Sequence, residues 1–460
     1  DEPSIGLHPY NVDGLMKIVR ELVDRKNSVV LVDHDPRILM DADQLIEIGP
    51  GAGKEGGRIV TQGTPLEAEK NPHSLIGPYL SGKESLKVRS RATEKDMFEN
   101  GSIRIKTKPF YTVKALDVSI PKGRMIAVTG VSGSGKTSLV IECLVPALQA
   151  VIQGTKLPEH VDSIEAKGIQ SVKVIDSKPI GANVRSTVAT YDGVFDDLRK
   201  LFARTADAKA KGLTAGDFSY NTGKLRCPVC DGTGIITMDV QFLPDVDTIC
   251  PSCGGSRYGK DAYDILWKSK EKDSVSVSLP GLLKLTVEEA SGILHEETKI
   301  AKQLKILQDL GVCYLTLGEA TPALSGGEAQ RLKLAYEMET PQQGSVFVFD
   351  EPTIGLHPQD VKKLVLIFDH LIQLGATVIV IEHDLELVTN CDYIIDMGPW
   401  GGTEGGRVVV EGTPEAVAAT SESITGRYLK QELAEDKKCS GKFRKKSFAV
   451  KHIFRKYQKI

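Results

Sequence analysis

A glycine-rich loop between an apolar strand and an apolar helix constrains the fold of this chain more than any other feature. Residues 126–137 read IAVTGVSGSGKT; the apolar run 125–128 predicts a buried strand, and 138–148 predicts a helix. This order is typical of a P-loop, whose glycines let backbone N–H groups surround nucleotide phosphates. A chance turn rich in glycine and serine is the alternative, and the flanking elements disfavour it.

The P-loop pattern assigns roles to the polar residues of the loop. Lys136 would neutralise the β- and γ-phosphate oxygens, and the Thr137 hydroxyl would bind magnesium. The nucleotide would lie against Gly130, Ser132, Gly133, Gly135, Lys136, Thr137 and Ser138.

Two more apolar strands are predicted to end in side chains that suit phosphate chemistry. The run 346–349 leads into Asp350 and Glu351, and the run 377–381 leads to His383. The first acid can hold magnesium, the second can orient the attacking water, and the histidine can reach the γ-phosphate. A purely structural histidine is the alternative, which its place behind a P-loop disfavours. We expect the catalytic residues to be Glu351, His383 and Lys136.

A further glycine pair lies in residues 324–330, which read LSGGEAQ and precede RLKLAYEM, a stretch with helical spacing. Alone, this stretch predicts only a helix N-terminus, which can bind an anion. With the P-loop and the strand-end residues it resembles the signature of ABC-type ATPases. There Ser325, Gly326 and Gly327 would bind the nucleotide held by the opposite subunit.

The chain contains an ungapped internal repeat. Residues 1–9 read DEPSIGLHP and 350–358 read DEPTIGLHP, and the match continues at a constant offset through His34 and His383. The spacing is too long for a solenoid. We interpret the repeat as two copies of one domain. Residue 1 would lie in the middle of the first copy, so that the chain would be a fragment or one half of a split protein. Glu2 and His34 would then lack a P-loop, and we expect weak ATP hydrolysis unless the chain pairs with itself.

Four cysteines form two CxxC pairs separated by residues 231–249, namely Cys227, Cys230, Cys250 and Cys253. Two such knuckles supply the four thiolates of a structural zinc site. Free buried thiols or a redox pair are the alternatives, and no thioredoxin-like setting supports the latter. Basic and aromatic residues beside the knuckles could face nucleic acid or simply form a solvated surface: Lys224, Arg226, Arg257 and Tyr258.

Length and composition bound the class of protein. The 460 residues exceed one ordinary domain, and 41% hydrophobic with 26% charged residues suits a globular chain. The net charge of −3 means that any nucleic-acid binding comes from local patches. No apolar run approaches the roughly 18–20 residues of a membrane span. We see no signal peptide either, and we predict a cytoplasmic location.

These motifs together resemble the UvrA family, the damage-sensing ATPases of bacterial nucleotide excision repair. The matching stretches are TGVSGSGKT, CPVC…FLPDV…CPSCGGSRY, LSGGEAQRLKLA, FDEPTIGLHP and EGGRVV, which extend to about residue 433. Family members carry two cassettes in one chain, which would explain the repeat. The chain looks like the tail of a first cassette followed by a complete second one.

The resemblance implies an α/β fold, in which a P-loop cassette with a mostly parallel sheet carries an inserted zinc module and a helical signature subdomain. It implies ATP hydrolysis coupled to binding of double-stranded DNA, with magnesium and zinc as cofactors and no nuclease activity of its own. It also implies a dimer, a UvrB-like helicase subunit as partner, and no membrane. Zinc would be held by Cys227, Cys230, Cys250 and Cys253, and magnesium by Thr137 and Asp350.

Two stretches depart from the family pattern. Ser177 stands where a glutamine usually precedes Ser-Pro-Ile-Gly, which puts a magnesium and water contact in doubt, although Asp176 is adjacent. Residues 109–118 lack the usual Asn-Asn-Leu-Lys. The departures favour a UvrA-like paralog, of a kind linked to drug resistance or without an assigned role, over a housekeeping repair subunit.

The expected domain boundaries follow the motifs. They are 1–85 for the tail of the first cassette, 86–108 for a linker, 109–205 for the P-loop part, 206–283 for the zinc module, 284–340 for the signature subdomain, 341–433 for the remaining second cassette and 434–460 for a basic tail. The tail mixes basic and aromatic residues, which suits single strands or phosphates. We favour a disordered tail or a reading-frame artefact.

Two other functions remain open. One is a non-catalytic, zinc-bearing DNA-binding scaffold in which ATP acts only as a conformational ligand. The other is a transport cassette that serves a separate membrane partner, which the predicted zinc module disfavours.

Overall fold

The computed structural model describes residues 1–51, 56–84, 88–181, 183–238, 246–270, 275–338 and 342–440. The chain forms two compact units. The sheet unit comprises residues 1–174 and 342–460, and the cysteine unit comprises residues 175–341. The aromatic residues of the basic tail, from Phe443 onward, lie outside the described residues.

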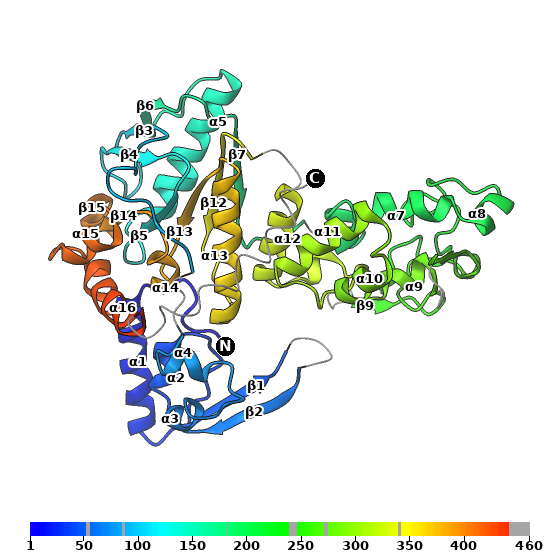
Figure 1. Cartoon of the computed structure of the whole chain (residues 1–460), viewed down its shortest axis with the longest axis horizontal. Helices are drawn as coiled ribbons and strands as arrows, with labels where there is room; N and C mark the ends of the chain where they lie inside the picture. The colour runs from blue at the N-terminus through cyan, green and yellow to red at the C-terminus, as the bar shows by residue number, and fades with distance from the viewer. Residues whose placement is uncertain are drawn as a thin grey trace. The chain divides into compact units, whose positions relative to one another are not determined.

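The sheet unit is built on a six-stranded sheet in the order β15-β14-β5-β13-β12-β7 (Figure 1). The strands are β5 (Met125–Thr129), β7 (Ser171–Ile175), β12 (Ser345–Asp350), β13 (Thr377–Ile381), β14 (Tyr393–Gly398) and β15 (Arg407–Gly412). Strands β12, β13, β5 and β14 are parallel, and β15 runs antiparallel to β14. Their near-continuous burial is typical of parallel strands covered on both faces, which confirms the predicted α/β class with a mostly parallel sheet.

Helices cover the six-stranded sheet. The P-loop is followed by a π-helical turn, Ser138–Leu144, and by α5 (Val145–Gln153), whose apolar residues share one core with β5. Helix α13 (Pro358–Gln373) packs against β13 and β5. The remaining helices of this part are α14 (Leu385–Val388), α15 (Pro414–Ala419) and α16 (Ile424–Ser440), with a short 3-10 turn at Gly402–Glu404.

A smaller antiparallel sheet extends the same core, in the order β4-β3-β6. Its strands are β3 (Ser102–Thr107), β4 (Asp117–Pro121) and β6 (Val161–Glu165). Strand β3 lies inside the range 86–108 that the sequence predicted as a linker, so that prediction is wrong for residues 102–107. The polar composition concealed the alternation of Ile103 and Ile105, both fully buried, which is the period-two pattern of a strand.

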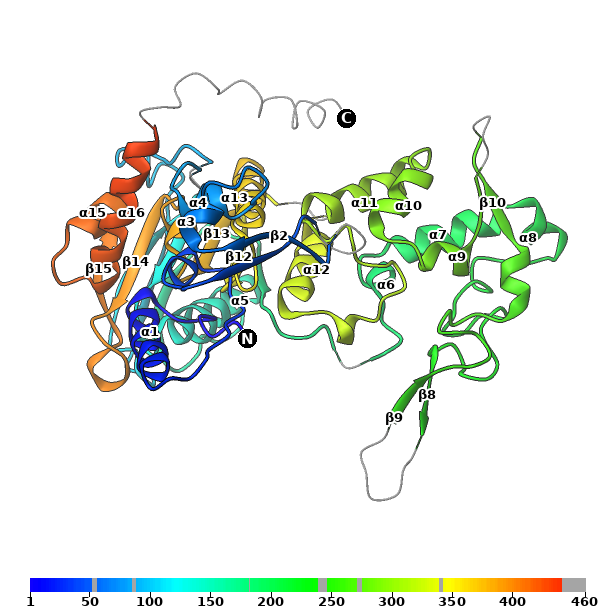
Figure 2. The same cartoon turned by 90° about the horizontal axis from the view of Figure 1, so that it is seen from below.

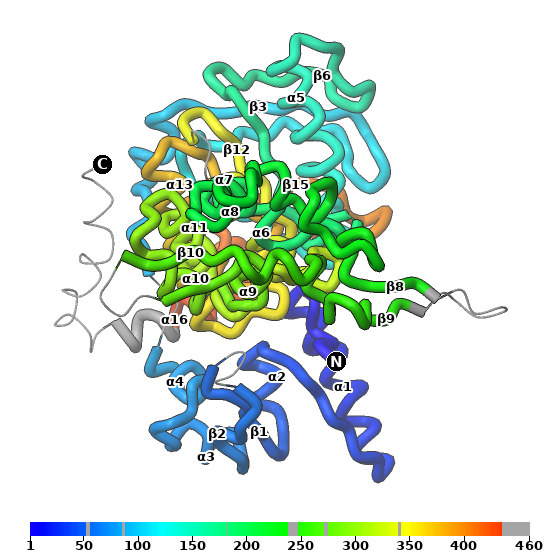
Figure 3. The backbone as a smooth tube through the Cα atoms, turned by 90° about the vertical axis from the view of Figure 1, so that its right-hand side faces the viewer, coloured from blue at the N-terminus to red at the C-terminus, as the bar shows by residue number. Residues whose placement is uncertain are grey.

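The first repeat contributes its own group of elements to the sheet unit (Figure 3). These are α1 (Pro9–Asp24), α2 (Pro36–Met40), β1 (Leu45–Gly49), β2 (Arg58–Gly63), α3 (Pro65–Ala68) and α4 (Gly77–Leu80). Strands β1 and β2 form an antiparallel pair by themselves.

The cysteine unit is mainly helical, with two short hairpins. Its helices are α6 (Val188–Tyr191), α7 (Val194–Ala203), α8 (Ala206–Ala210), α9 (Leu279–Leu283), α10 (Val287–Ile293), α11 (Thr298–Asp309) and α12 (Gly326–Met338), with 3-10 turns at Lys260–Asp264 and Thr321–Ala323. The hairpins are β8 (Ile235–Met238) with β9 (Val246–Ile249), and β10 (Leu266–Lys268) with β11 (Ser276–Ser278). Figure 2 shows β8 and β9 projecting from the rest of this unit. Across the part of the chain that the structure describes, no helix is long and apolar enough to cross a membrane.

Candidate functional site

The P-loop lies at the carboxyl end of β5, where the sequence predicted it. Lys136 is buried, and its ammonium group donates to the carbonyl oxygens of Gly130 at 3.0 Å and Val131 at 3.1 Å. Burial lowers the Lys136 pKa to about 8, although the carboxylates of Glu351 and Asp350 oppose the shift. A buried ammonium satisfied by loop carbonyls can transfer its hydrogen bonds to an entering phosphate at little cost in charge burial.

The backbone packing of the P-loop explains why glycine is required at its first position. Gly130 has a φ of 129°, and a Cβ there would come within 2.0 Å of the Met397 carbonyl oxygen. The glycine-rich loop after β14 packs on the P-loop in turn, because Gly402 N–H donates to Gly133 O at 3.1 Å and Gly406 N–H donates to Ser134 O at 3.0 Å. This packing and these hydrogen bonds from the loop after β14 position the P-loop without a bound ligand.

Two of the expected catalytic side chains meet beside the P-loop. The Glu351 carboxylate lies 3.6 Å from His383 Nε2. Glu351 directly follows β12, and His383 is the second residue after β13, the neighbouring parallel strand. Burial raises the Glu351 pKa, with the Asp350 charge adding to the shift, and burial lowers that of His383 below its usual value. Glu351 has a φ of 48°, a strained conformation for a non-glycine residue of the kind that concentrates at functional sites.

A fully buried acid holds the turn that carries Glu351. Glu382 accepts hydrogen bonds from the Thr353 N–H and hydroxyl and from the N–H groups of His383 and Asp384. Burial raises the Glu382 pKa, and these donors oppose the shift. Glu382 therefore fixes the positions of both candidate catalytic residues.

The first repeat also contributes to this region, which sequence reasoning did not foresee. His8 is fully buried, and its ring lies edge-on to the His383 ring with 5.8 Å between centroids. Gly6 lies against the Glu351 carboxylate, since a Cβ there would be 3.0 Å from Oε2. The internal repeat held the available signal, because His8 matches His357 of the second copy.

The signature stretch forms the N-terminus of α12 in the cysteine unit. Ser325 and Glu328 make reciprocal hydrogen bonds there, Ser325 N–H to the Glu328 carboxylate at 2.7 Å and Glu328 N–H to Ser325 Oγ at 3.4 Å. Gly326 and Gly327 begin the helix. Asp176, the acid beside Ser177, pairs with Lys333 of the same unit.

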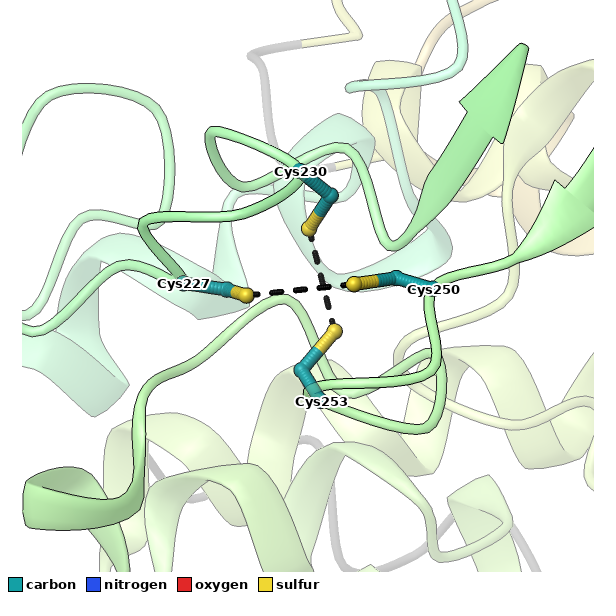
Figure 4. Close-up of side chains that lie close together, drawn as sticks. All are labelled: Cys227, Cys230, Cys250 and Cys253. Carbon is teal, nitrogen blue, oxygen red and sulfur yellow. Dashed lines mark hydrogen bonds between the residues drawn. The ribbon is translucent and has the colours of Figure 1, made fainter. Parts of the chain in front are cut away.

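The four cysteines of the two knuckles converge on one point in the cysteine unit (Figure 4). All four sulfur atoms lie within 4.8 Å of one another. Cys227 Sγ is 4.0 Å from Cys250 Sγ, and Cys230 Sγ is 3.7 Å from Cys253 Sγ. These separations are far beyond a disulfide bond of about 2.05 Å. They suit four thiolates around one cation, since Zn–S distances of about 2.3 Å place tetrahedral sulfurs a little under 4 Å apart.

The electrostatics of the cluster also fit a metal ion. Although burial opposes ionisation, backbone N–H groups lower the Cys227 pKa to about 7, and Gly234 N–H donates to Cys230 Sγ at 3.3 Å. Burial raises the Cys253 pKa to about 12. A bound cation favours the ionised form of the thiols that coordinate it, and the four-cysteine cluster is compatible with zinc in that role.

Two of the side chains expected at the surface beside the knuckles, facing either nucleic acid or solvent, are not exposed. Arg257 and Tyr258 are buried; the Arg257 guanidinium donates to Val184 O, and the Tyr258 hydroxyl donates to Phe218 O. Lys224 and Arg226 are more exposed and pair with Asp217 and Asp231 respectively. The buried pair supports the fold of the module, because each side chain connects the segment after the second knuckle to a backbone carbonyl of an earlier loop.

The fold and the P-loop region define an ATPase cassette of the ABC type. No family model matches the chain. It is 43% identical to UvrABC system protein A of Staphylococcus aureus (strain COL) and of Aquifex aeolicus (strain VF5), over 95% of this chain and 45% and 46% of those proteins. The solved structure of UvrA2 from Deinococcus radiodurans superposes with a TM-score of 0.85 at 38% identity, over 94% of this chain and 51% of that one.

The chain belongs to the UvrA family. It spans about half the length, or less, of the relatives it matches. The predicted family is thus confirmed.

Proposed function

We propose that the sheet unit binds and hydrolyses ATP, and that in the whole protein this reaction is coupled to recognition of damaged double-stranded DNA in excision repair. The observation that carries the ATPase proposal is the convergence of Lys136, Glu351 and His383 at the carboxyl ends of the adjacent strands β5, β12 and β13. Ligands of open α/β sheets bind at this edge. The DNA-repair part rests on the likeness to UvrABC system protein A.

In the proposed reaction each residue acts on the phosphates or on water. The P-loop N–H groups from Gly130 to Thr137 cradle the phosphates, and Lys136 turns from the loop carbonyls to the β/γ oxygens. Glu351 orients the attacking water, and His383 contacts the γ-phosphate. Thr137 and Asp350 would hold magnesium, which neutralises phosphate charge when bound.

The other nucleotide contact comes from Ser325, Gly326 and Gly327, which would close over ATP held by another cassette. This makes a dimer part of the proposal, because composite sites need two cassettes. The zinc held by the cysteine cluster has a structural role in it, since four protein thiolates leave no open position for catalysis. A UvrB-like helicase subunit is the proposed protein partner.

The test of the ATPase proposal is steady-state ATP hydrolysis by the purified chain, with and without duplex DNA that carries a bulky lesion. We expect weak turnover that damaged DNA stimulates and that Lys136→Ala removes. Turnover unaffected by Lys136→Ala would contradict the site assignment. If Glu351→Gln loses turnover but still binds DNA, ATP hydrolysis and DNA binding are separate activities. If no DNA stimulates turnover, the result would favour a transport cassette.

The zinc proposal has its own test. Elemental analysis of the chain is expected to give one zinc per chain, and chelation is expected to make residues 206–283 sensitive to protease while the sheet unit stays resistant. Replacing Cys250 by serine should reproduce the chelated state without a chelator. A protease pattern unchanged by metal removal would contradict a structural metal.

A further inference from the structure

A continuous chain of hydrogen bonds connects the first repeat to the strand that carries the P-loop. His8 Nδ1 accepts the Tyr10 N–H at 3.2 Å, which caps helix α1. Neutral His8 then carries its proton on Nε2, which lies 3.1 Å from Thr425 Oγ1. The Thr425 hydroxyl donates to Asp396 Oδ1 at 2.6 Å. Each donor in this series of hydrogen bonds has one acceptor, so the direction in which the bonds are donated is fixed.

Asp396 is the point at which the chain reaches the nucleotide site. The same oxygen, Oδ1, accepts the Thr129 hydroxyl at 2.8 Å, and Oδ2 accepts the Ser423 hydroxyl at 2.7 Å. Thr129 directly precedes Gly130, and the residue after Asp396 supplies the carbonyl that packs against Gly130. All these side chains are buried, so water does not compete for the bonds.

The His8 ring supports a candidate catalytic side chain as well. It packs edge-on against His383, with 5.8 Å between the ring centroids. His383 Nδ1 is buried and has no hydrogen-bond partner among the described residues. The orientation of His383 therefore depends on the groups packed around it, which include the Glu351 carboxylate and the His8 ring.

The second copy of the repeat offers a natural comparison. His357 matches His8 and caps α13 in the same way, accepting the Gln359 N–H at 3.2 Å. The position that matches Thr425 is Ile76, which has no hydroxyl. His357 Nε2 accordingly has no partner in the described part of the chain. The cap is common to both repeats, while the link to an acid exists only at His8.

We propose that His8 is a positioning residue for ATP hydrolysis. Its hydrogen bond to Thr425, which in turn donates to Asp396, holds the His8 ring against His383, so that turnover depends on docking of the first repeat. This inference rests on the proposed ATPase function. It predicts an effect on kcat, because His383 acts when charge develops on the γ-phosphate. The KM for ATP should change little, because Asp396 keeps its bonds from Thr129 and Ser423.

Two substitutions of His8 separate positioning from capping. The Asn amide oxygen can replace Nδ1, so His8→Asn keeps the cap of α1 and loses the bond to Thr425. The Gln amide nitrogen can replace Nε2–H, so His8→Gln keeps the bond and loses the cap. We expect His8→Asn to lower kcat about tenfold with KM within about twofold, since small misplacements of catalytic groups have large effects on rate. His8→Gln, which keeps the bond to Thr425 but replaces the ring by an amide against His383, should lower kcat less than His8→Asn does.

Two further variants complete the experiment. Thr425→Val, which removes only the hydroxyl, should lower kcat as much as His8→Asn does, and the double variant should add nothing. His357→Asn should leave kcat unchanged, because His357 has the cap and no link. Thermal unfolding midpoints show whether each variant is folded.

The outcomes distinguish the inference from the function on which it rests. A wild-type chain without ATP turnover would remove the proposed function and the inference together. A wild-type chain with turnover, and a kcat for His8→Asn equal to that of wild type or higher than that of His8→Gln, would overturn the inference alone and leave His8 as a helix cap.

Discussion

The two repeats have closely similar local structure and opposite surroundings. Helices α1 and α13 both have sixteen residues, a histidine cap and a proline in the first turn. The hairpins β1–β2 and β14–β15 share their register, with a bulge at the same place. Glu2 and Glu351 have similar strained φ values, 40° and 48°, and each carboxylate lies 3.6 Å from the histidine of its own repeat.

The difference lies in the segment that should be a central strand. In the second repeat it forms β13, which pairs in parallel with β12 and β5 and buries Ile379 completely. In the first repeat residues 28–32 form no strand, and Val30, which matches Ile379, is 88% exposed. Helices and hairpins close their hydrogen bonds locally, whereas a parallel strand needs neighbours supplied by distant parts of a chain. Similar sequence therefore gives similar local elements, and the neighbours decide burial.

Stability measurements should show the largest contrast. Ile379→Ala is expected to lower the unfolding free energy of the sheet unit by about 2–5 kcal/mol, because it leaves a cavity where the buried Ile379 side chain packs in the core. Val30→Ala should change it by less than about 0.5 kcal/mol, as is usual for an exposed site. Urea denaturation followed by circular dichroism measures both. Equal effects would mean that residues 28–32 are buried in solution.

Turnover should separate the matched acids. Glu351→Gln is expected to reduce kcat at least about 100-fold, in the range of general acid–base contributions. Glu2→Gln should leave kcat within about twofold, because residues 28–32, the counterpart of β13, form no strand beside it. ATPase assays of the two variants at saturating ATP decide the point. A large effect of Glu2→Gln would show that the first repeat takes part in catalysis, for instance through pairing of two chains.

The matched histidines should differ by a smaller factor. His383→Ala is expected to lower kcat about tenfold, or about 1.4 kcal/mol in the barrier, through loss of a γ-phosphate contact. His34, whose side chain is 41% exposed, should tolerate alanine. MgATP affinity, measured by calorimetry for both variants, serves as the control and should stay within about threefold of wild type.

The smallest effect concerns the two histidine caps and pH. Burial, with the charges of Lys136 and Arg37, lowers the His8 pKa to about 3, so between pH 6.5 and 3 the unfolded chain binds a proton that the folded chain does not. The free energy of unfolding therefore decreases as the pH is lowered through that window, by up to about 1.4 kcal/mol per pH unit for one proton. His8→Asn should flatten this slope between pH 6 and 5.

The matched cap provides the control for this slope. Burial also lowers the His357 pKa, but the Asp360 carboxylate opposes the shift. His357→Asn should therefore flatten the slope less than His8→Asn does. Urea titrations at several pH values give both slopes, and identical slopes for the two variants would contradict the stronger burial of His8.

Much of the fold and of the candidate ATP site could be predicted from short sequence patterns. The P-loop, the strand ends at Asp350 and His383, and the CxxC pairs have spacings that specify chemistry locally, and the structure brings each set together. The linker prediction failed at residues 102–107, because composition outweighed the alternation of two isoleucines. Arg257 and Tyr258 were expected at a surface and are buried, because their packing depends on residues far along the chain.

By itself, the sequence determined the phosphate loop, the acids at the strand ends, the cysteine cluster and the presence of two repeats, since each depends on spacing along the chain. Only the tertiary structure decided that His8 of the first repeat packs on His383 of the second, and that Thr425 connects it to Asp396. It also decided that one copy of the matching segment is a buried strand, whereas the other copy is exposed and forms no strand. These properties depend on neighbours hundreds of residues away, which local patterns do not encode.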